Sequence, residues 1–224
     1  MARPENTRVL IVDEHPLFCI GLSSLLKLIP GYSVVGEAAT IDETLKIAEK
    51  ERPHLVIMEI HFENENGMEL ITQLRSRYQE IIILVMSTHD ERYYSERILR
   101  LGAQGYIMKN APANIVKEAI LTVMRGKVYL SETEKERIFE IMTSESTKGM
   151  KDWANSLRKL SDRELQIFSL IGKGYGAIEI ASKLNLSTKT VDTHKEHIKI
   201  KLHCNTSQGL RQLAIEWLNN LASL

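Results

Sequence analysis

The stretch HLVIMEIHFENENG, residues 54–67, decides the fold. Its first part, residues 55–60, is a short apolar run bounded by His54 and by a loop rich in Asn and Gly, which is typical of a buried parallel strand. Glu59 stands at the end of that run. Ligand sites of open α/β sheets collect at the carboxyl ends of the strands. We therefore expect Glu59 to lie at a functional edge of a sheet.

Short β-branched runs alternate with amphipathic segments in the first half of the chain. The expected strands are residues 8–13, 32–37, 55–60, 81–87 and 105–109. The expected helices are residues 17–28, 42–51, 69–77, 91–101 and 112–125, the last with Pro112 in its first turn. This alternation predicts an α/β fold: a doubly wound five-stranded parallel (βα)5 domain with helices on both faces of the sheet.

The chain divides into three parts. Residues 1–127 hold the alternating segments, and residues 128–156 form a polar linker with a short helical stretch at residues 134–142. Residues 157–224 are helical throughout and begin with Ser161 and Glu164 at the spacing of a capping box. We expect an all-α four-helix domain there.

Composition and charge narrow the class of protein. The chain has 224 residues, 43% of them hydrophobic, and no apolar run near the ~20 residues that span a bilayer. It shows no secretion signal, and Cys19 and Cys204 lack metal-ligand spacing. We expect a cytoplasmic protein with free thiols and no membrane partner. The net charge is zero, yet Lys and Arg outnumber Asp and Glu in residues 157–224, which suits contact with nucleic acid.

Polar side chains stand at the ends of the expected strands. They are Asp13, Glu14, Glu59, Ser87, Thr88 and Lys109. In a parallel sheet these positions converge on one edge. Oxygen ligands suit Mg²⁺, and a lysine and a hydroxyl suit phosphoryl oxygens. Asp13, Glu14 and Glu59 are thus candidate Mg²⁺ ligands, although we do not expect a required cofactor; alternatively, each acid is an ordinary solvated loop residue.

The first 125 or so residues resemble a response-regulator receiver domain, and the whole chain resembles the NarL/LuxR family of two-component regulators. The matching pieces are IVDEHPLF, LVIMEI followed by Gly67, ILVMSTHD and GAQGYIMKN. The resemblance implies that Asp13 and Glu14 form the metal pair. It also implies that Ser87, Tyr106 and Lys109 are the switch hydroxyl, the switch aromatic and the phosphate-reading lysine. A histidine kinase is the implied partner, and Glu59 stands where the family has its phosphoacceptor aspartate.

Glutamate at position 59 changes the expected chemistry. It adds one methylene, which moves the carboxylate outward by roughly 1.5 Å. Phosphoryl transfer depends on positioning, so we expect a receiver that works without efficient phosphorylation. The longer side chain would reach Lys109 or Ser87 and imitate part of a phosphorylated aspartate. Two alternatives stay open: a kinase-driven switch phosphorylated on Glu59, and a receiver retained only for dimerisation.

The second motif is GAIEIASKLNLSTKTVDTHKEHIKIKL, residues 176–202. Two helical segments are separated by a turn in which Ser187 is a natural N-cap. Val191, His194, Ile198 and Leu202 fall on one face of the second helix, so we expect His194 to be a core histidine. His197 and His203 lack zinc-site spacing and are expected to be ordinary surface or boundary residues.

The opposite face of that second helix suits contact with DNA, because helix-turn-helix modules place such a face in the major groove. The candidate DNA-contacting residues are Lys189, Thr190, Asp192, Thr193, Lys195, Glu196 and Lys199. Asp192, Thr193 and Glu196 would face base edges, and the three lysines would bind phosphates.

Residues 157–220 resemble the LuxR-type DNA-binding domain, although Gly176 stands where that family usually has Thr, Ser or Asn. The resemblance implies a transcription regulator, not an enzyme, that binds double-stranded DNA as a homodimer. Candidate dimer surfaces are residues 208–218 and a face around Tyr93, Tyr94, Tyr106 and the fifth helix. An adaptor whose helix-turn-helix surface binds protein instead of DNA is the alternative.

Overall fold

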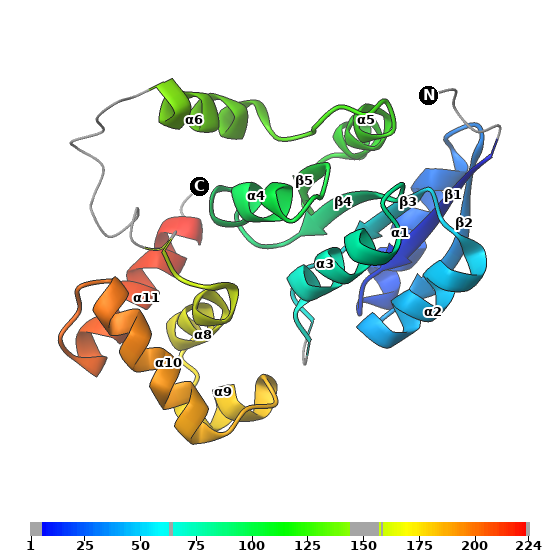
Figure 1. Ribbon diagram of the computed structural model, residues 1–224. Helices are drawn as coiled ribbons and strands as arrows, with labels where there is room; N and C mark the ends of the chain where they lie inside the picture. The colour runs from blue at the N-terminus through cyan, green and yellow to red at the C-terminus, as the bar shows by residue number, and fades with distance from the viewer. Residues whose placement is uncertain (1–5, 63–64, 144–156, 158, 223–224) are drawn as a thin grey trace. The chain divides into compact units, whose positions relative to one another are not determined.

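The computed structural model of the chain describes residues 6–62, 65–143, 157 and 159–222 (Figure 1). The chain forms two compact units, Met1–Glu140 and Ile141–Leu224. Among the described residues, no helix has the length and apolar character that crossing a membrane requires.

The first unit is built on a parallel sheet with the strand order β2-β1-β3-β4-β5, which confirms the predicted fold. The strands are β1 (Thr7–Val12), β2 (Tyr32–Ala38), β3 (Leu55–Met58), β4 (Ile82–Ser87) and β5 (Gly105–Met108). The helices that alternate with them are α1 (Pro16–Lys27), α2 (Ile41–Glu51), α3 (Gly67–Arg77), α4 (Glu91–Arg100) and α5 (Ala113–Val123).

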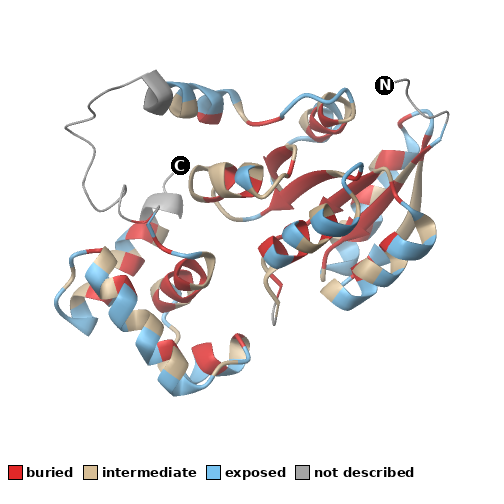
Figure 2. Ribbon diagram, in the orientation of Figure 1, coloured by how far each residue is buried: buried red, intermediate tan, exposed pale blue. Residues whose placement is uncertain are grey.

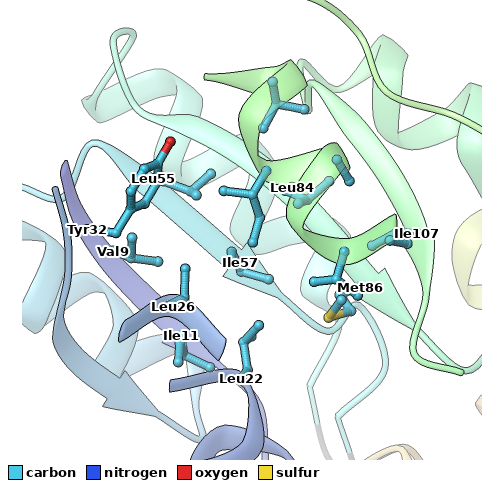
Figure 3. Packing of buried hydrophobic residues seen from close by; sticks show 14 of the residues in the cluster. Val9, Ile11, Leu22, Leu26, Tyr32, Leu55, Ile57, Leu84, Met86 and Ile107 are labelled. Carbon is cyan, nitrogen blue, oxygen red and sulfur yellow. The ribbon is translucent and has the colours of Figure 1, made fainter. Parts of the chain in front are cut away.

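Both faces of this sheet are covered. Val9, Ile11 and Ile57 join side chains of α1 and α5 in one hydrophobic cluster (Figure 3). Leu10 and Val12 of β1 point to the other face and are also fully buried. Accordingly, strands β1, β3, β4 and β5 are buried along most of their length and β2 is mostly half-buried, whereas the helices have a buried stripe and an exposed side (Figure 2).

Several elements begin or end one or two residues from the predicted positions. Strand β3 ends at Met58, so Glu59 lies just beyond the strand, although its amide still donates to the Val12 carbonyl at 2.9 Å. Helix α3 begins at Gly67 because the Asn66 side chain caps it by accepting from Met68 N. Helix α5 begins at Ala113, and Pro112 is the N-cap instead of the first helical residue.

The first unit extends past the predicted boundary at residue 127. Tyr129 pairs with the edge strand, because its amide donates to Gln104 O at 2.9 Å and its carbonyl accepts from Tyr106 N at 3.0 Å. Helix α6 (Glu132–Thr143) follows, and Ser131 N donates to Glu91 Oε1 at 2.9 Å. The first part of the predicted linker therefore packs on the α/β unit. The remainder, residues 144–156, lies outside the described residues.

The second unit contains helices α8 (Asp162–Gly172), α9 (Ala177–Lys183), α10 (Thr188–Lys201) and α11 (Ser207–Ala222), as predicted for an all-α four-helix domain. The capping box at its start is confirmed: Ser161 Oγ accepts from Glu164 N, and Ser161 N donates to Glu164 Oε2 at 2.6 Å. Phe168 of α8 and Trp217 of α11 pack with their ring centroids 5.4 Å apart.

Gly67 provides a test of the turn after β3. A Cβ there would lie 2.6 Å from Ile60 Cα and 2.9 Å from Glu59 O, so the backbone of the loop would have to move. We expect Gly67→Ala to lower the free energy of unfolding by about 1–3 kcal/mol in chemical denaturation. The control is Gly21→Ala in α1, where nothing lies within 4 Å and alanine favours the helix by up to ~1 kcal/mol. A Gly67→Ala chain as stable as wild type would contradict this account of the turn.

Candidate functional sites

The predicted strand-end residues meet at the carboxyl edge of the sheet, and Lys109 is at their centre. Its Nζ lies 2.5 Å from Asp13 Oδ2 and 3.1 Å from Glu59 Oε2. Asp13 and Glu59 are buried, and the Lys109 side chain is only 9% exposed. One ammonium thus serves two buried carboxylates. Phe18 of α1 adds a cation–π contact, with its ring centroid 4.6 Å from Nζ.

The second oxygen of Glu59 is held by hydrogen-bond donors. Buried Ser87, the last residue of β4, donates from Oγ to Glu59 Oε1 at 2.6 Å. The amides of Ile60 and His61 donate to the same oxygen at 2.7 and 3.2 Å. Glu59 is therefore a fixed carboxylate that contacts both Lys109 and Ser87, the two partners proposed from the sequence.

The charge state of Lys109 follows from these contacts. Burial disfavours the ammonium, but the hydrogen bond to Asp13 and the attraction of Glu59 and Asp13 outweigh burial and raise the pKa of Lys109. The pKa of Lys109 in the folded state lies above the value of ~10.4 for an exposed lysine. The contribution of these ion pairs to the stability of the folded chain is therefore fully present below pH ~10.4. It is lost only as the pH rises through the folded-state pKa, so Lys109 is charged at neutral pH.

Tyr106 lies beside the pocket with its side chain fully buried. Its hydroxyl donates to the His89 carbonyl at 2.7 Å, and burial raises the pKa of Tyr106 well above its usual value. Tyr94 is fully buried as well. In this conformation neither tyrosine contributes to an exposed surface, whereas Tyr93, the third tyrosine of the predicted dimer face, is half-buried, so that face stays a prediction.

The remaining pocket residues are less enclosed. Glu14 is half-buried, and Thr88 is exposed, in contrast to Ser87. Asp13 Oδ1 accepts from His15 N at 3.0 Å. Asp13 and Glu14 offer the oxygen donors that Mg²⁺ prefers, and a bound Mg²⁺ would neutralise phosphoryl oxygens. A Mg²⁺ ion held by Asp13 and Glu59 together would have to displace the Lys109 ammonium, so the donor set fits this ion best through Asp13 and Glu14.

Two histidines at the pocket were missed in the sequence analysis. His61 follows Glu59 by two residues, and His89 follows Ser87 by two residues. Their rings stack with centroids 3.7 Å apart and an interplanar angle of 24°. The sequence places each histidine two residues after a predicted pocket residue, and this equal spacing could have indicated that both histidines lie at the pocket. The spacing brings the two rings together only because β3 and β4 are neighbours in the sheet.

Helix α10 of the second unit presents the predicted polar face. Ser187 caps it by accepting from Thr190 N at 3.0 Å, and Val191 and Ile198 are fully buried on the opposite side. Lys189, Asp192, Thr193 and Glu196 are exposed, whereas Thr190, Lys195 and Lys199 are half-buried. Most of the predicted face is therefore accessible to solvent.

Acids and lysines alternate on this face and pair with each other. Lys195 Nζ lies 3.4 Å from Asp192 Oδ1, and Lys199 Nζ lies 2.8 Å from Glu196 Oε1. Lys189 lies on the exposed first turn of α10 and belongs to neither of these two ion pairs. Its ammonium can therefore bind a phosphate without breaking either pair.

His194 lies half-buried on the inner side of α10, and burial lowers its pKa. It comes close to Glu164 and His197, a grouping that the spacing of the histidines alone does not reveal. At the start of α9, Gly176 has no side chain to cap the helix. Glu179 supplies half of a capping box by accepting from Gly176 N at 2.8 Å.

Comparison with known proteins identifies a family for each of the two units. Residues 9–121 match the response regulator receiver domain, and residues 158–214 match the bacterial regulatory proteins of the luxR family. The chain belongs to the LuxR family of response regulators. Relatives of this LuxR-family regulator include the oxygen regulatory protein NreC of Staphylococcus aureus and of Staphylococcus carnosus. Each is 32% identical over 210 residues, which cover 93% of this chain and 97% of NreC.

Solved structures share the fold of the LuxR-family regulator. RcsB of Salmonella enterica serovar Typhimurium, bound to promoter P1flhDC with the phosphomimetic BeF₃⁻, superposes with a TM-score of 0.68 at 23% identity, covering 98% of this chain and 100% of RcsB. A LuxR-family two-component response regulator from Aurantimonas sp. SI85-9A1 gives a TM-score of 0.58 at 26% identity, covering 62% of this chain and 99% of that structure.

The ion-pair bridge of the LuxR-family regulator is open to a direct stability test. Lys109→Met leaves two buried carboxylates without a counter-charge, so we expect the free energy of unfolding to fall by about 3–5 kcal/mol. Adding Glu59→Gln to Lys109→Met removes one of those charges and should recover part of the loss. Lys50→Met is the control, because the Lys50 side chain is 81% exposed; we expect a change within ~0.5 kcal/mol. Wild-type stability of Lys109→Met would show that the bridge does not support the fold.

Proposed function

We propose that this LuxR-family regulator is a DNA-binding transcription regulator whose receiver works without an acyl phosphate at residue 59. One observation carries the proposal: the Glu59 carboxylate already contacts Lys109 at 3.1 Å and Ser87 at 2.6 Å. In the family that the chain resembles, these are the groups that read a phosphoryl group. Glu59 engages both groups with a single permanent charge.

The same contacts disfavour phosphorylation of Glu59. An in-line transfer needs an attacking oxygen aligned with the phosphorus, and an error of about 1 Å can slow such a step ~10²-fold. Oxygen Oε1 accepts three hydrogen bonds, and Oε2 faces Lys109. Attack would require the carboxylate to leave one of these partners. A kinase-driven switch on Glu59, with a histidine kinase as partner, is the alternative that phosphorylation assays would reveal.

The second unit supports DNA as the partner. Helix α10 combines a capped N-terminus, a buried apolar side and an open polar side, the arrangement of a recognition helix. One RcsB structure contains promoter DNA, and another describes two RcsB dimers bound to two parallel DNAs. We infer that this chain likewise binds double-stranded DNA in the cytoplasm as a homodimer, and that it is a regulator and not an enzyme.

Two surfaces are available for the homodimer. Helix α1 exposes Leu17 and Ile20, at 85% and 59%, which is unusual for large apolar side chains. In residues 208–218 of α11, Leu210, Ala214 and Trp217 are buried within the unit, and the other apolar side chains, Leu213, Ile215 and Leu218, are half-buried and so less exposed than Leu17 and Ile20. The apolar surface of α1 is therefore the better candidate for a stable contact.

Magnesium is not required in this proposal, because Lys109 already supplies the positive charge that two buried carboxylates need. Asp13 and Glu14 would hold the ion if it binds. Acetyl phosphate with Mg²⁺ should therefore label the wild-type chain poorly and change its affinity for DNA by less than about threefold. The DNA for this assay is an operator that the unphosphorylated chain selects from random duplexes. Phosphorylation is measured from the mass of the intact protein.

Glu59→Asp is the matched variant, because it shortens the side chain and keeps the charge. We expect it to gain labelling that depends on the donor. If instead wild-type Glu59 is labelled stoichiometrically and the affinity for the operator rises strongly, the kinase-driven alternative is correct.

The DNA face is tested on the same operator. Lys189→Ala should weaken binding to all sequences and lower the slope of log affinity against log salt by about 1, because one phosphate contact is lost. Thr193→Ala should relax preference at one base position by about 1–3 kcal/mol. Lys50→Ala in α2 is the control and should change neither quantity. Sedimentation of the wild-type complex should show two chains on the DNA.

Unchanged binding in both Lys189→Ala and Thr193→Ala would refute the assigned face. A wild-type chain that binds no duplex DNA at low salt would favour the adaptor alternative.

A further inference from the structure

Beside Glu59 in the receiver pocket, two imidazoles and one carboxylate come together. Glu59 and His61 follow β3, and His89 follows the neighbouring strand β4. One ligand-capable atom from each residue lies within 4.8 Å of those of the other two. We propose that Glu59, His61 and His89 bind one divalent transition-metal ion of the Zn²⁺ class. The inference rests on the proposed function, because it names a ligand for a pocket that works without phosphorylation.

The donor set selects the class of ion. Two imidazole nitrogens and a carboxylate oxygen form a set that Zn²⁺ takes in proteins, with a fourth position left for water or another ligand. Mg²⁺ prefers oxygen ligands alone and keeps most of its waters. Imidazole instead suits Zn²⁺ and its neighbours in the first transition row. The site is thus chemically distinct from the carboxylates of Asp13 and Glu14, although Glu59 borders both.

The geometry requires a small adjustment. Bonds of ~2.0–2.1 Å to a tetrahedral ion place ligand atoms about 3.3 Å apart, so atoms that now lie within 4.8 Å of one another must approach by up to about 1.5 Å. Both histidines are half-buried as whole residues, although the two ring nitrogens of His61 are buried. The adjustment that the proposal requires is a rotation of the two stacked rings, whose centroids are 3.7 Å apart and which pack edge-on against Tyr94.

Neighbouring groups support the three ligands. Ser87 Oγ lies 2.6 Å from Glu59 Oε1 and 3.3 Å from His89 Nδ1, so one buried hydroxyl orients two of them. If Glu59 turns toward a metal ion, Lys109 keeps its 2.5 Å ion pair with Asp13. The buried aspartate is therefore not left without a counter-charge when the ion binds.

A second grouping in the chain provides the internal control. Glu164, His194 and His197 also lie within 4.8 Å of one another. There, however, Glu164 accepts from Ser161 N in the capping box and pairs with Lys201 Nζ at 2.6 Å. Metal binding there would remove the cap from α8 and the Glu164 carboxylate from Lys201, whereas Lys109 keeps its ion pair with Asp13 when Glu59 turns, so we assign the ion to the receiver pocket.

The test uses the full-length chain without a histidine tag. Zn²⁺ is titrated by calorimetry, and Co²⁺ is used as a coloured probe whose visible absorption reports its coordination. We expect one Zn²⁺ per chain with micromolar or tighter affinity, retained in excess Mg²⁺. His61→Gln and His89→Gln should each weaken binding at least tenfold and reduce the Co²⁺ absorption, whereas His197→Gln should leave both unchanged.

Two results would overturn the assignment: a wild-type chain that binds no Zn²⁺, or a His61→Gln/His89→Gln double variant that binds it as tightly as wild type. Circular dichroism is used to check that each variant is folded. If His61→Gln does not fold, the Zn²⁺ affinity of His89→Gln alone tests the assignment. Operator binding by the metal-free chain is measured on the same preparation. If the wild-type chain binds the operator but no Zn²⁺, only this inference is wrong. If the metal-free chain does not bind the operator, the proposed function is wrong.

Discussion

Lys109 places one ammonium within ion-pair distance of two buried carboxylates, Asp13 and Glu59. Each carboxylate would cost several kcal/mol to bury without a counter-charge, so the carboxyl edge of the sheet depends on this cation. The bridge joins the ends of β1, β3 and β5, which are not all neighbours in the sheet. Ser87 from β4 completes it through Glu59. The loops that carry these residues are thereby held in one arrangement without any ligand.

This arrangement links the extra methylene of Glu59 to function. The longer side chain reaches the hydroxyl and the ammonium that a receiver would offer to a phosphoryl group, and it keeps them occupied. We propose that a pocket in that state does not depend on a phosphodonor. Beside Glu59, the rings of His61 and His89 stack, and their nitrogens suit a cation of the Zn²⁺ class. In the proposed metal-bound state Glu59 turns toward the ion, and Lys109 keeps its ion pair with Asp13.

Much of the fold could be predicted from the sequence because local rules decided it. Apolar runs fixed the five strands, and Ser161 and Ser187 marked helix starts that the structure confirms. Contacts between distant segments could not be predicted. His61 and His89 are unrelated in sequence until β3 and β4 pair, and the bond from Ser131 to Glu91 extends the first unit to Glu140. The burial of Tyr94 and Tyr106 could not be predicted for the same reason, because burial on one side of a helix or strand depends on what packs there.

The most direct measurement of the central claim is an NMR titration of the Lys109 side chain in the full-length protein, followed through its Cε and Nζ signals. The bridge predicts that Lys109 stays protonated past the ~10.4 of an exposed lysine, and that Glu59→Gln shifts its pKa downward. A Lys109 that titrates at or below the ordinary value in the wild-type chain, and is unaffected by Glu59→Gln, would contradict the claim that Glu59 and Lys109 hold the pocket together.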